Sequence, residues 1–308
     1  MKHLAGAAFL AAVAASLTFA AAGVPATSGV GGTATPVAAK AKLPALPSYV
    51  KARHKWVIGV KCDFPPFGYI DYTGQHVGYD VAIARRFAQL AFGSKFKVKL
   101  TCVTTPSRIP ALQSSQVDII ISTLTWTQAR NDVIDFSTPY YSATGRLLVP
   151  NQSSINTVKD IPGKTIVTTR GSIYSTWMRN CFKNSTLLEV DGTAAAVTAV
   201  KEGRAASFMF DDAFVVGVAS LDNSLKLTND KFLNIPWGIG IRKGDKAMNK
   251  WVNAALKYMK DRNEFTPILH ANVPKKFWSG FDDNVPRKGK ANFSYPVGKD
   301  LPSDCSGA

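Results

Sequence analysis

One stretch of the chain decides the fold: Thr123-Leu124-Thr125-Trp126-Thr127-Gln128-Ala129-Arg130. An apolar, β-branched run at residues 117–122 precedes it and predicts a buried strand. The stretch therefore lies where a strand ends and a helix begins, which is where ligands bind in α/β sheets. Arg130 can offer two parallel donors to a carboxylate, beside the hydroxyls of Thr123 and Thr125. The alternative is that Arg130 is a solvated helix residue and the threonines are only helix caps.

The composition of the whole chain is that of an ordinary globular protein. Its 308 residues are 46% hydrophobic and 19% charged, enough for one large domain or two smaller ones. The net charge of +16 would suit nucleic acid, an anionic membrane or an anionic ligand. The cations are scattered, however, and the sequence has no zinc-ligand spacing and no Walker loop. We therefore expect no nucleic-acid partner, no metal and no cofactor.

The N-terminal region has the layout of an export signal. Lys2 and His3 precede an Ala-rich apolar run that continues to Ala22, and small residues near its end suit cleavage. We expect residues 1–22 to be a signal peptide and residues 23–49 to be a disordered leader. The mature protein would be secreted or periplasmic, without a lipid anchor because no cysteine follows the cleavage region. A retained membrane anchor is the alternative.

The cysteine count fits an exported protein. The four cysteines are Cys62, Cys102, Cys181 and Cys305, an even number that predicts two disulfides. Cys62 and Cys102 each lie near the end of a predicted strand, and a right-handed crossover would bring those strands side by side. We favour Cys62–Cys102, which leaves Cys181–Cys305 to hold the C-terminal tail, among three arithmetically allowed pairings. The long spacings argue against a metal site.

Three predicted strands should end at one edge of a parallel sheet. They lie at residues 55–60, 96–103 and 117–122, and an amphipathic helix at 78–93 separates the first two. This βαβαβ order brings their carboxyl ends together. The residues that follow the strands could face a ligand: Lys61, Phe64, Thr105, Arg108, Thr123, Thr125 and Arg130. Phe64 could equally be a core ring.

A second unit follows after about residue 146. A strand at 165–169 turns into a helix at Gly171-Ser172-Ile173, and free N–H groups at a helix start attract anions. A buried strand at 206–210 ends in Asp211 and Asp212, which could hold an ammonium group. The alternative for this pair is one helix cap and one solvated carboxylate.

Together these segments resemble the extracellular solute-binding proteins of polar amino-acid ABC transporters. The resemblance runs from about Trp56 to Asn263. Its specificity lies in the order and spacing of short segments: Asp63 to Phe67, Val77 to Asp80, Arg108 to Gln113, Val117 to Ile120, Thr123 to Arg130, Asp135 to Tyr141, Gly171-Ser172, Gly203-Arg204, Asp211-Asp212 and Gly238 to Gly244. The resemblance implies an α/β, two-lobed periplasmic-binding-protein fold of type II.

The resemblance also implies how the chain divides. In order, the parts would be the first part of lobe 1 at 50–142, lobe 2 at 146–236, the return of lobe 1 at 241–285 and a C-terminal tail at 286–308. Two crossing strands would act as hinges near residues 143–146 and 236–240. Ligand binding would then close the lobes by hinge motion.

The amino-acid clamp of the family transfers onto matching residues. By resemblance, Arg130 would hold the ligand α-carboxylate, and Thr125 with the Thr123 backbone would hold the carboxylate and the amine. The N–H groups of Ser172 and Ile173 would complete the carboxylate site, and Asp211 would accept from the α-ammonium. Relatives commonly carry threonine where this chain has Ile173, so only a backbone contact would survive there.

Side-chain specificity depends on Lys61, Phe64 and Arg108. Relatives that bind cationic amino acids carry an acid at the Lys61 position, and relatives that bind glutamate and aspartate carry an arginine. Lys61 and Arg108 together would suit a second carboxylate and repel a cationic side chain. The sequence therefore predicts glutamate or aspartate, with glutamine or another polar amino acid next. The alternative is that Lys61 points into solvent.

An enzyme is the competing class, since the same fold hosts dehydratases acting on prephenate-like or arogenate-like acids. Such an enzyme needs an acid or base aimed into the cleft. The histidines are His3, His54, His76 and His270, and none lies at a predicted strand end. We expect a binding protein instead, a monomer whose partners are an amino acid and the membrane permease of an ABC transporter. A receptor ectodomain, which would need a further spanning segment or signalling domain, is not expected.

Overall fold

The structure is a computed structural model, and it describes residues 42–308. The expected signal peptide at 1–22 and most of the expected leader at 23–49 lie outside the described residues. Leu43 and Leu46, at the described end of that leader, pack against the hydrophobic core, and helix α1 (Ser48–Arg53) begins just after them. This end of the leader is therefore part of the folded unit, because its leucines cover apolar surface there.

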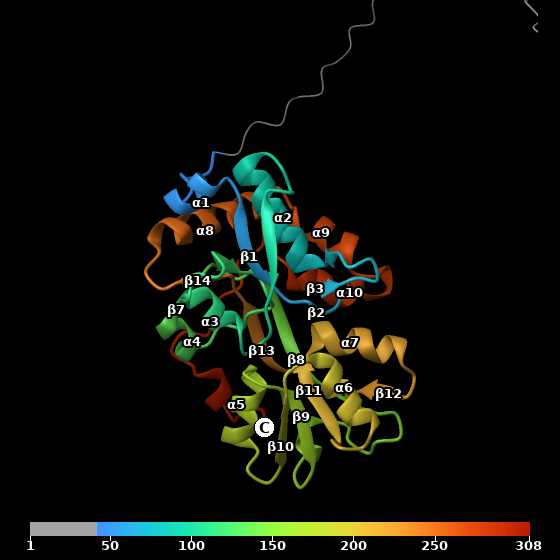
Figure 1. Ribbon diagram of the computed structural model, residues 1–308. Coiled ribbons are helices and arrows are strands. Elements are labelled where there is room, and N and C mark those ends of the chain that lie inside the picture. The colour runs from blue at the N-terminus through green and yellow to red at the C-terminus, as the bar shows by residue number, and fades with distance from the viewer. Residues whose placement is uncertain (1–41) are drawn as a thin grey trace, which may run out of the picture. The chain divides into compact units, whose positions relative to one another are not determined.

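Two β-sheets, each with helices packed against it, organise the described chain (Figure 1). We call the part built on the five-stranded sheet the first lobe and the part built on the six-stranded sheet the second lobe. The first-lobe sheet has the order β5-β1-β6-β14-β7. Its strands are β1 (Trp56–Val60), β5 (Val98–Cys102), β6 (Ile119–Ile120), β7 (Ile134–Phe136) and β14 (Gly240–Arg242). Strand β1 lies parallel to both β5 and β6, so the three strands expected from the sequence are confirmed.

Helix α2 (Tyr79–Phe92) forms where the sequence places an amphipathic helix. It follows Gly78, whose φ of +118° and closeness to the Phe67 carbonyl leave no room for a side chain, and it ends at Gly93 in the left-handed region. Its buried face carries apolar residues three and four apart, including Ile83, Ala84 and Phe87.

Within residues 42–308, the first lobe also contains a small second sheet and five further α-helices. A small three-stranded sheet contains β2 (Asp63–Phe64), β3 (Gly68–Ile70) and β4 (His76–Val77). The further helices are α3 (Arg108–Gln113), α4 (Gln128–Val133), α8 (Lys246–Asp261), α9 (Phe265–Asn272) and α10 (Trp278–Phe281).

The second lobe has the strand order β10-β9-β11-β8-β12, with β13 also paired to β8. Its strands are β8 (Tyr141–Pro150), β9 (Thr165–Thr169), β10 (Thr186–Val190), β11 (Ser207–Asp211), β12 (Leu225–Leu227) and β13 (Phe232–Trp237). Its helices are α5 (Ile173–Cys181), α6 (Thr193–Lys201) and α7 (Asp212–Leu221). Strands β9, β10 and β11 run parallel to one another, so α5 and α6 follow strand ends just as helices do in the first lobe.

Strands β8 and β13 run between the two lobes (Figure 1). They pair antiparallel from Tyr141 opposite Trp237 to Gly145 opposite Phe232. Residues 143–146, one of the two expected hinge segments, lie within β8, one of these two paired strands. The ten-residue β8 continues without interruption from the lobe junction into the second-lobe sheet.

Both expected disulfides are confirmed. Cys62 and Cys102 join β1 and β5 at their carboxyl ends, with Cα atoms 5.5 Å apart. Cys181, at the end of α5, joins Cys305 in the C-terminal tail, with Cα atoms 5.3 Å apart. The tail is irregular apart from the short helix η4 (Leu301–Ser303).

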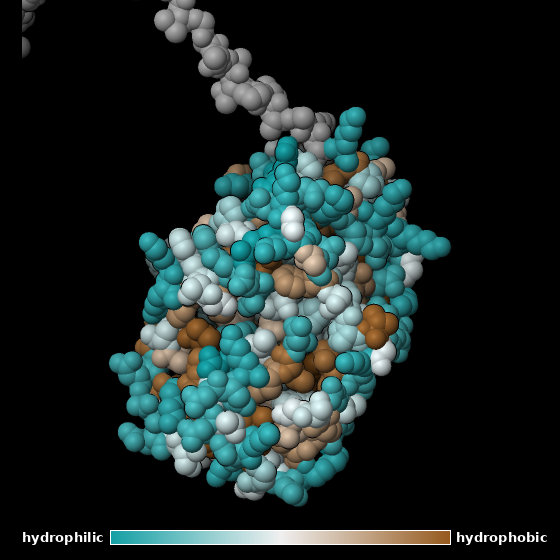
Figure 2. All heavy atoms as spheres, turned by 180° about the vertical axis from the view of Figure 1, so that it is seen from behind, coloured by the Kyte–Doolittle hydropathy of each residue, from teal (hydrophilic) through white to brown (hydrophobic). Residues whose placement is uncertain are grey.

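Figure 2 shows hydrophilic residues over most of one face, with apolar patches concentrated between the two ends. Between residues 42 and 308, no helix has both the length and the apolar character needed to cross a membrane.

Candidate functional site

A small cavity lies where strand ends of the two lobes face one another. The first lobe lines it with Thr105, Arg108, Thr123 and Thr125, and the second with Ser172, Ile173, Tyr174, Phe210 and Asp211. All nine residues are buried. The cavity thus contains seven of the ten binding residues that the sequence singles out. Lys61, Phe64 and Arg130 are the three outside the lining.

Thr123 holds an unusual backbone conformation at the first-lobe side of the cavity. Its φ of +50° is rare for a β-branched residue. Its N–H donates to Asp80 Oδ2 at 2.9 Å and to the Tyr140 hydroxyl at 3.2 Å. The N–H of Thr123 is therefore engaged within the protein. Its carbonyl oxygen already accepts from Arg108 but has a second lone pair, so it is the backbone group that could also accept from a ligand amine. Asp80 is fully buried, and burial raises its pKa to about 7.

Arg108 is a buried cation in the wall of the cavity. Its Nη1 donates to the carbonyl oxygens of Ser122 at 2.6 Å and Thr123 at 3.2 Å. Its Nε atom has no hydrogen-bond partner among residues 42–308. Burial lowers the pKa of the Arg108 guanidinium to about 10, so a nearby anion would relieve an unfavourable charge.

Arg130 reaches across from the first lobe to the second. Its Nη1 donates to the Thr125 carbonyl oxygen at 2.7 Å, and its Nη2 donates to the Gly171 carbonyl oxygen at 2.9 Å. The side chain is half-buried, so the alternative of a freely solvated arginine is wrong. Burial and the charge of Arg108 lower the pKa of Arg130 to about 9. The two guanidinium groups thus make this side of the cavity electropositive.

Asp211 supplies the opposite charge from the end of β11. Its Oδ1 accepts from the Tyr174 hydroxyl at 2.8 Å. Burial, together with neighbouring Asp212, raises the pKa of Asp211 to about 7 against the opposing effects of Tyr174 and the two arginines. Asp212 is turned away, since Thr144 donates to its carboxylate from N and Oγ1. Sequence reasoning missed Tyr174, which lies one residue beyond the motif that marked the helix start.

The start of α5 forms part of the second-lobe wall. Ser172 caps this helix, because its Oγ accepts from the Ser175 N–H at 3.2 Å. The Ser172 N–H itself donates to the Thr169 carbonyl at 3.1 Å. The prediction that this N–H is free for a ligand is therefore wrong, because the tight turn at Gly171 engages it. The N–H groups of Ile173 and Tyr174 belong to the first helical turn, which has no acceptors within the helix.

Lys61 lies behind the cavity wall, paired with an acid. Its side chain is buried, with Nζ 3.0 Å from Asp63 Oδ1 and 3.1 Å from Thr105 Oγ1. The alternative that Lys61 points into solvent is therefore wrong. Burial lowers the pKa of Lys61, while the attraction of Asp63 opposes this. Thr105 stands between this ion pair and the cavity.

Phe64 joins an aromatic cluster at the junction of the lobes. Its ring centroid lies 5.6 Å from that of Phe210 and 5.3 Å from that of Phe214, both in the second lobe. Trp237 packs edge-on at 6.0 Å. Phe64 is fully buried and supports the cavity wall through Phe210 rather than lining it. Phe67 is buried in the same cluster, as expected of a structural ring.

This geometry fits a known family of proteins. Residues 56–272 match the model of the bacterial extracellular solute-binding proteins, family 3. The chain belongs to this family. It is 34% identical over 221 residues to the ABC transporter glutamine-binding protein GlnH of Bacillus subtilis, covering 71% of this chain and 81% of that protein. It is 36% identical over 199 residues to the glutamine-binding protein of Geobacillus stearothermophilus, covering 64% of this chain and 76% of that protein.

A solved structure shares the architecture of this family-3 protein. The cysteine-binding protein of Campylobacter jejuni superposes with a TM-score of 0.69 at 26% identity, covering 73% of this chain and 92% of that one. The fold is therefore the two-lobed α/β periplasmic-binding-protein fold of type II. The relatives are solute-binding proteins of transport systems, and of the three described histidines none lines the cavity.

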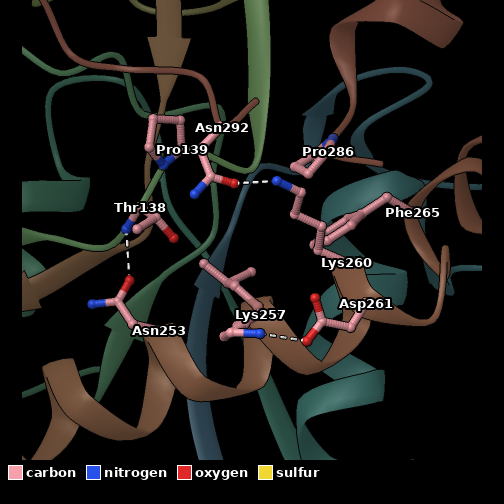
Figure 3. A pocket seen from close by; sticks show the side chains of 10 residues that line it. Thr138, Pro139, Asn253, Lys257, Lys260, Asp261, Phe265, Pro286 and Asn292 are labelled. Carbon is pink, nitrogen blue, oxygen red and sulfur yellow. Dashed lines mark hydrogen bonds and ion pairs between the residues drawn. The ribbon is translucent and has the colours of Figure 1, made fainter. Parts of the chain in front are cut away.

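Two further features of this family-3 protein lie outside the cavity between the lobes. Ligand atoms of Cys62, His76 and Cys102 lie within 4.8 Å of one another, but the two sulfurs form a disulfide and offer no thiolate to a metal. A second cavity, of about 330 Å³, lies on the first lobe between α8, α9 and the tail (Figure 3). Its lysines already have partners there: Lys257 pairs with Asp261, and Lys260 donates to Asn292 (Figure 3).

Proposed function

We propose that this family-3 protein binds a polar L-α-amino acid in the cavity between the lobes and delivers it to the permease of an ABC transporter. One observation carries the proposal. The guanidinium groups of Arg108 and Arg130, from the first lobe, and the carboxylate of Asp211, from the second, lie at the same buried cavity. A zwitterion presents the two complementary charges at a fixed separation. Charge-assisted hydrogen bonds are strong in such a dry site.

The chemistry of the wall suggests a role for each group. Arg130 would hold the α-carboxylate with two donors. Its guanidinium would give up its present contacts with the carbonyl oxygens of Thr125 and Gly171 to do so. The first-turn N–H groups of Ile173 and Tyr174 would complete the carboxylate site. Asp211 would accept from the α-ammonium, helped by the Thr123 carbonyl and the Thr125 hydroxyl.

The charge balance around the cavity favours an amino acid without net charge, and glutamine is the first candidate. Three cations and three carboxylates influence one another there: Lys61, Arg108 and Arg130, with Asp63, Asp80 and Asp211. Asp212 is not counted, because its contacts with Thr144 turn it away from the cavity. With all six ionised, the site is neutral and suits a zwitterion with an uncharged polar side chain. The names of two relatives, both glutamine-binding, support the same choice.

Glutamate or aspartate, which the sequence favours, is the second candidate. Arg108 is the observation in its favour, because its guanidinium lines the cavity and its Nε has no partner among the described residues. Burial also raises the pKa of Asp80 to about 7, so its partial protonation at neutral pH would leave the site positive. An acidic side chain would then be accepted.

Ligand entry requires the lobes to separate. Every residue lining the cavity is at most 8% exposed, so an amino acid has no open path to it in this arrangement. We infer hinge motion about the junction of β8 and β13 with the first lobe. We also infer that the protein works outside the cytoplasm, because its family is extracellular and both disulfides suit an oxidising compartment.

The direct test is a binding screen of the purified protein against the common L-amino acids by isothermal titration calorimetry. We expect tight binding of glutamine, weaker binding of glutamate and aspartate, and no binding of lysine or arginine. Tightest binding of arginine would contradict the proposal that Lys61 and Arg108 repel a cationic side chain. Binding of no amino acid would contradict the proposed function as a whole.

A further inference from the structure

The pairing of Lys61 with Asp63 leads to one inference that deepens the proposed function and rests on it. We propose that Asp63 is a specificity-determining residue, which cancels the charge of Lys61 and thereby disfavours acidic ligands. The cation at position 61 faces Thr105, a residue of the cavity wall, at 3.1 Å. Without a counter-charge, such a buried lysine would attract a ligand carboxylate. Asp63, at 3.0 Å, supplies that counter-charge from within the protein.

Contacts with the second lobe hold Asp63 in this position. The Thr193 hydroxyl donates to the Asp63 carbonyl oxygen at 2.6 Å, and the Thr193 N–H lies 3.4 Å from Asp63 Oδ2. Thr193 is the first residue of α6, whose own N-cap, Gly192, provides no side-chain cap. The carboxylate of Asp63 thus lies at the start of a helix from the other lobe, where negative charge is favoured. One residue therefore links the charge of the binding site to the contact between the lobes.

The substitution Asp63→Asn separates these two roles. The amide keeps an oxygen that can accept from the Thr193 N–H, so the contact between the lobes is preserved. It removes the negative charge, so Lys61 is left buried with the Thr105 hydroxyl as a partner but without a counter-charge. A ligand carboxylate could then take that place. We expect the ratio of glutamate affinity to glutamine affinity to rise at least tenfold.

The experiment compares glutamine and glutamate dissociation constants of three full-length variants with the wild type, using calorimetry. Asp63→Asn should shift the ratio, and the double variant Lys61→Met with Asp63→Asn should return it to within threefold of the wild-type value. Asp283→Asn is the matched control, because its side chain is 94% exposed and pairs only with Arg287 among the described cations. Circular dichroism establishes that each variant is folded.

The outcomes separate this inference from the proposed function. If the wild type binds glutamine or glutamate and Asp63→Asn leaves their ratio unchanged, the role of Asp63 is refuted while the proposed function stands. If the wild type binds neither glutamine nor glutamate, this inference fails, whereas the proposed function fails only if no amino acid binds in the screen. If Asp63→Asn does not fold, Asp63→Ser tests the same loss of charge, with the same tenfold criterion.

A separate observation concerns the C-terminal tail, which contacts both lobes. We propose that residues 285–308, called the strap here, form a third connection that limits how far the lobes open. On the first lobe, Lys260 Nζ donates to the Lys290 carbonyl at 2.7 Å and to Asn292 Oδ1 (Figure 3). Pro286 and Asn292 also line the cavity in that figure. The strap is thus fixed to the first lobe before it reaches the junction.

The middle of the strap packs on the junction itself. The Tyr295 ring stacks on Trp126 with centroids 5.5 Å apart, and its hydroxyl donates to the Ser137 carbonyl oxygen at 2.6 Å. A Cβ atom at Gly238 would collide with that hydroxyl. Gly238 is the residue after β13, where the chain re-enters the first lobe. Tyr295 therefore lies against the point about which the lobes must turn.

The end of the strap is bound to the second lobe covalently. Cys305 is joined to Cys181, the last residue of α5, and the C-terminus lies beside this helix (Figure 1). Trp177 Nε1 donates to the Asp304 carbonyl oxygen at 2.9 Å, and Asn180 Nδ2 donates to that of Pro302 at 2.9 Å. The other end of α5 forms the cavity wall. Separation of the lobes would therefore have to extend the strap between Tyr295 and Leu301.

The two disulfides provide a matched test. The double variant Cys181→Ser with Cys305→Ser releases the strap, whereas Cys62→Ser with Cys102→Ser breaks a bond within the first lobe only. Small-angle X-ray scattering of the ligand-free proteins should give a larger radius of gyration for the first variant alone. This measurement needs no ligand, so it does not depend on which amino acid binds. Equal radii for the first variant and the wild type would refute the strap.

A second approach covers the case in which the released variant does not fold. A protease site placed at residues 297–299, where Val297 is 74% exposed, allows the strap to be cut after folding. Cutting should increase the radius of gyration while the disulfide keeps the end attached to α5. An unchanged radius after complete cutting would also refute the proposal.

Discussion

Arg130 Nη2 donates to the carbonyl oxygen of Gly171 at 2.9 Å, so a first-lobe guanidinium contacts the turn that precedes α5 of the second lobe. The same guanidinium holds the Thr125 carbonyl through Nη1 at 2.7 Å. Arg130 is therefore positioned between the two walls of the cavity by backbone groups of both lobes. A ligand carboxylate bound there would lie next to the free N–H groups of the first turn of α5.

Replacement of Arg130 by alanine should lower glutamine affinity at least 100-fold. The variant loses a charge-assisted, bidentate contact, and a factor of 100 corresponds to about 2.7 kcal/mol of binding free energy. Calorimetric titration gives the affinity, and Arg170→Ala is the control because that arginine is half exposed and pairs with Asp191 on the surface. A loss of less than tenfold would show that Arg130 does not hold the carboxylate.

Glutamine affinity should fall as the pH drops below 7. Burial raises the pKa of Asp211 to about 7 in the closed arrangement without ligand, and an ammonium ligand favours the ionised carboxylate, so a bound ligand lowers that pKa. Binding is then at full strength above pH 7 and weakens by up to about tenfold per unit below it, since the proton must first be released. The charged and titratable groups that interact with Asp211 are Tyr174, Arg108, Arg130, Asp212, Lys61 and Tyr141.

Titrations between pH 5 and 8.5 provide the measurement. Asp211→Asn binds more weakly and should show a flat profile over this range, because the titrating carboxyl is gone. A slope that persists in Asp211→Asn would assign the titration to the other carboxyls whose pKa is raised by burial, Asp80 and Asp212.

The parts of the site that follow from local sequence pattern could be predicted from the sequence. The parts that depend on how one lobe packs against the other could not. Periodicity and strand-end position place Thr105, Arg108 and Thr123 at one edge, because carboxyl ends of parallel strands meet. The partner of Lys61 is different. Asp63 lies only two residues away, yet its role depends on the Thr193 contact that fixes it from the other lobe.

Phe64 and Tyr174 illustrate the same limit. The sequence leaves open whether Phe64 contacts ligand or core, because the rings that surround it, Phe210 and Phe214, lie about 150 residues away in the chain. Tyr174 has no motif signal, since its importance comes from one hydrogen bond to Asp211. The Cys181–Cys305 pairing could be inferred by elimination, but the passage of the tail across the junction could not.

Gly145→Ala should destabilise the protein by about 1–3 kcal/mol through overpacking. A Cβ atom at this position of β8 would lie 2.5 Å from Phe232 Cδ2 and 2.9 Å from Tyr174 Cε1, so a buried ring has to move. Gly217→Ala in α7 is the matched control, because nothing lies within 4 Å of its added Cβ. We expect that control to stabilise the protein by about 0.5–1 kcal/mol, since alanine is the better helix former. Urea unfolding followed by circular dichroism measures both, and equal stabilities would contradict the close packing of β8 against β13.

Phe64→Leu should weaken binding of glutamine and glutamate by the same factor. Its ring packs on Phe210 and Phe214 across the lobe junction and does not line the cavity, so it stabilises the closed arrangement without contacting a ligand side chain. Loss of aromatic contacts worth about 0.5–1.5 kcal/mol each should reduce both affinities by roughly tenfold. Calorimetry with the two amino acids measures the ratio, and Phe96→Leu, at a ring that is 76% exposed, is the control that should change neither affinity. A loss confined to one of the two amino acids would mean that Phe64 touches the ligand side chain. The ligand side chain would then lie against β2 rather than against Thr105 and Arg108.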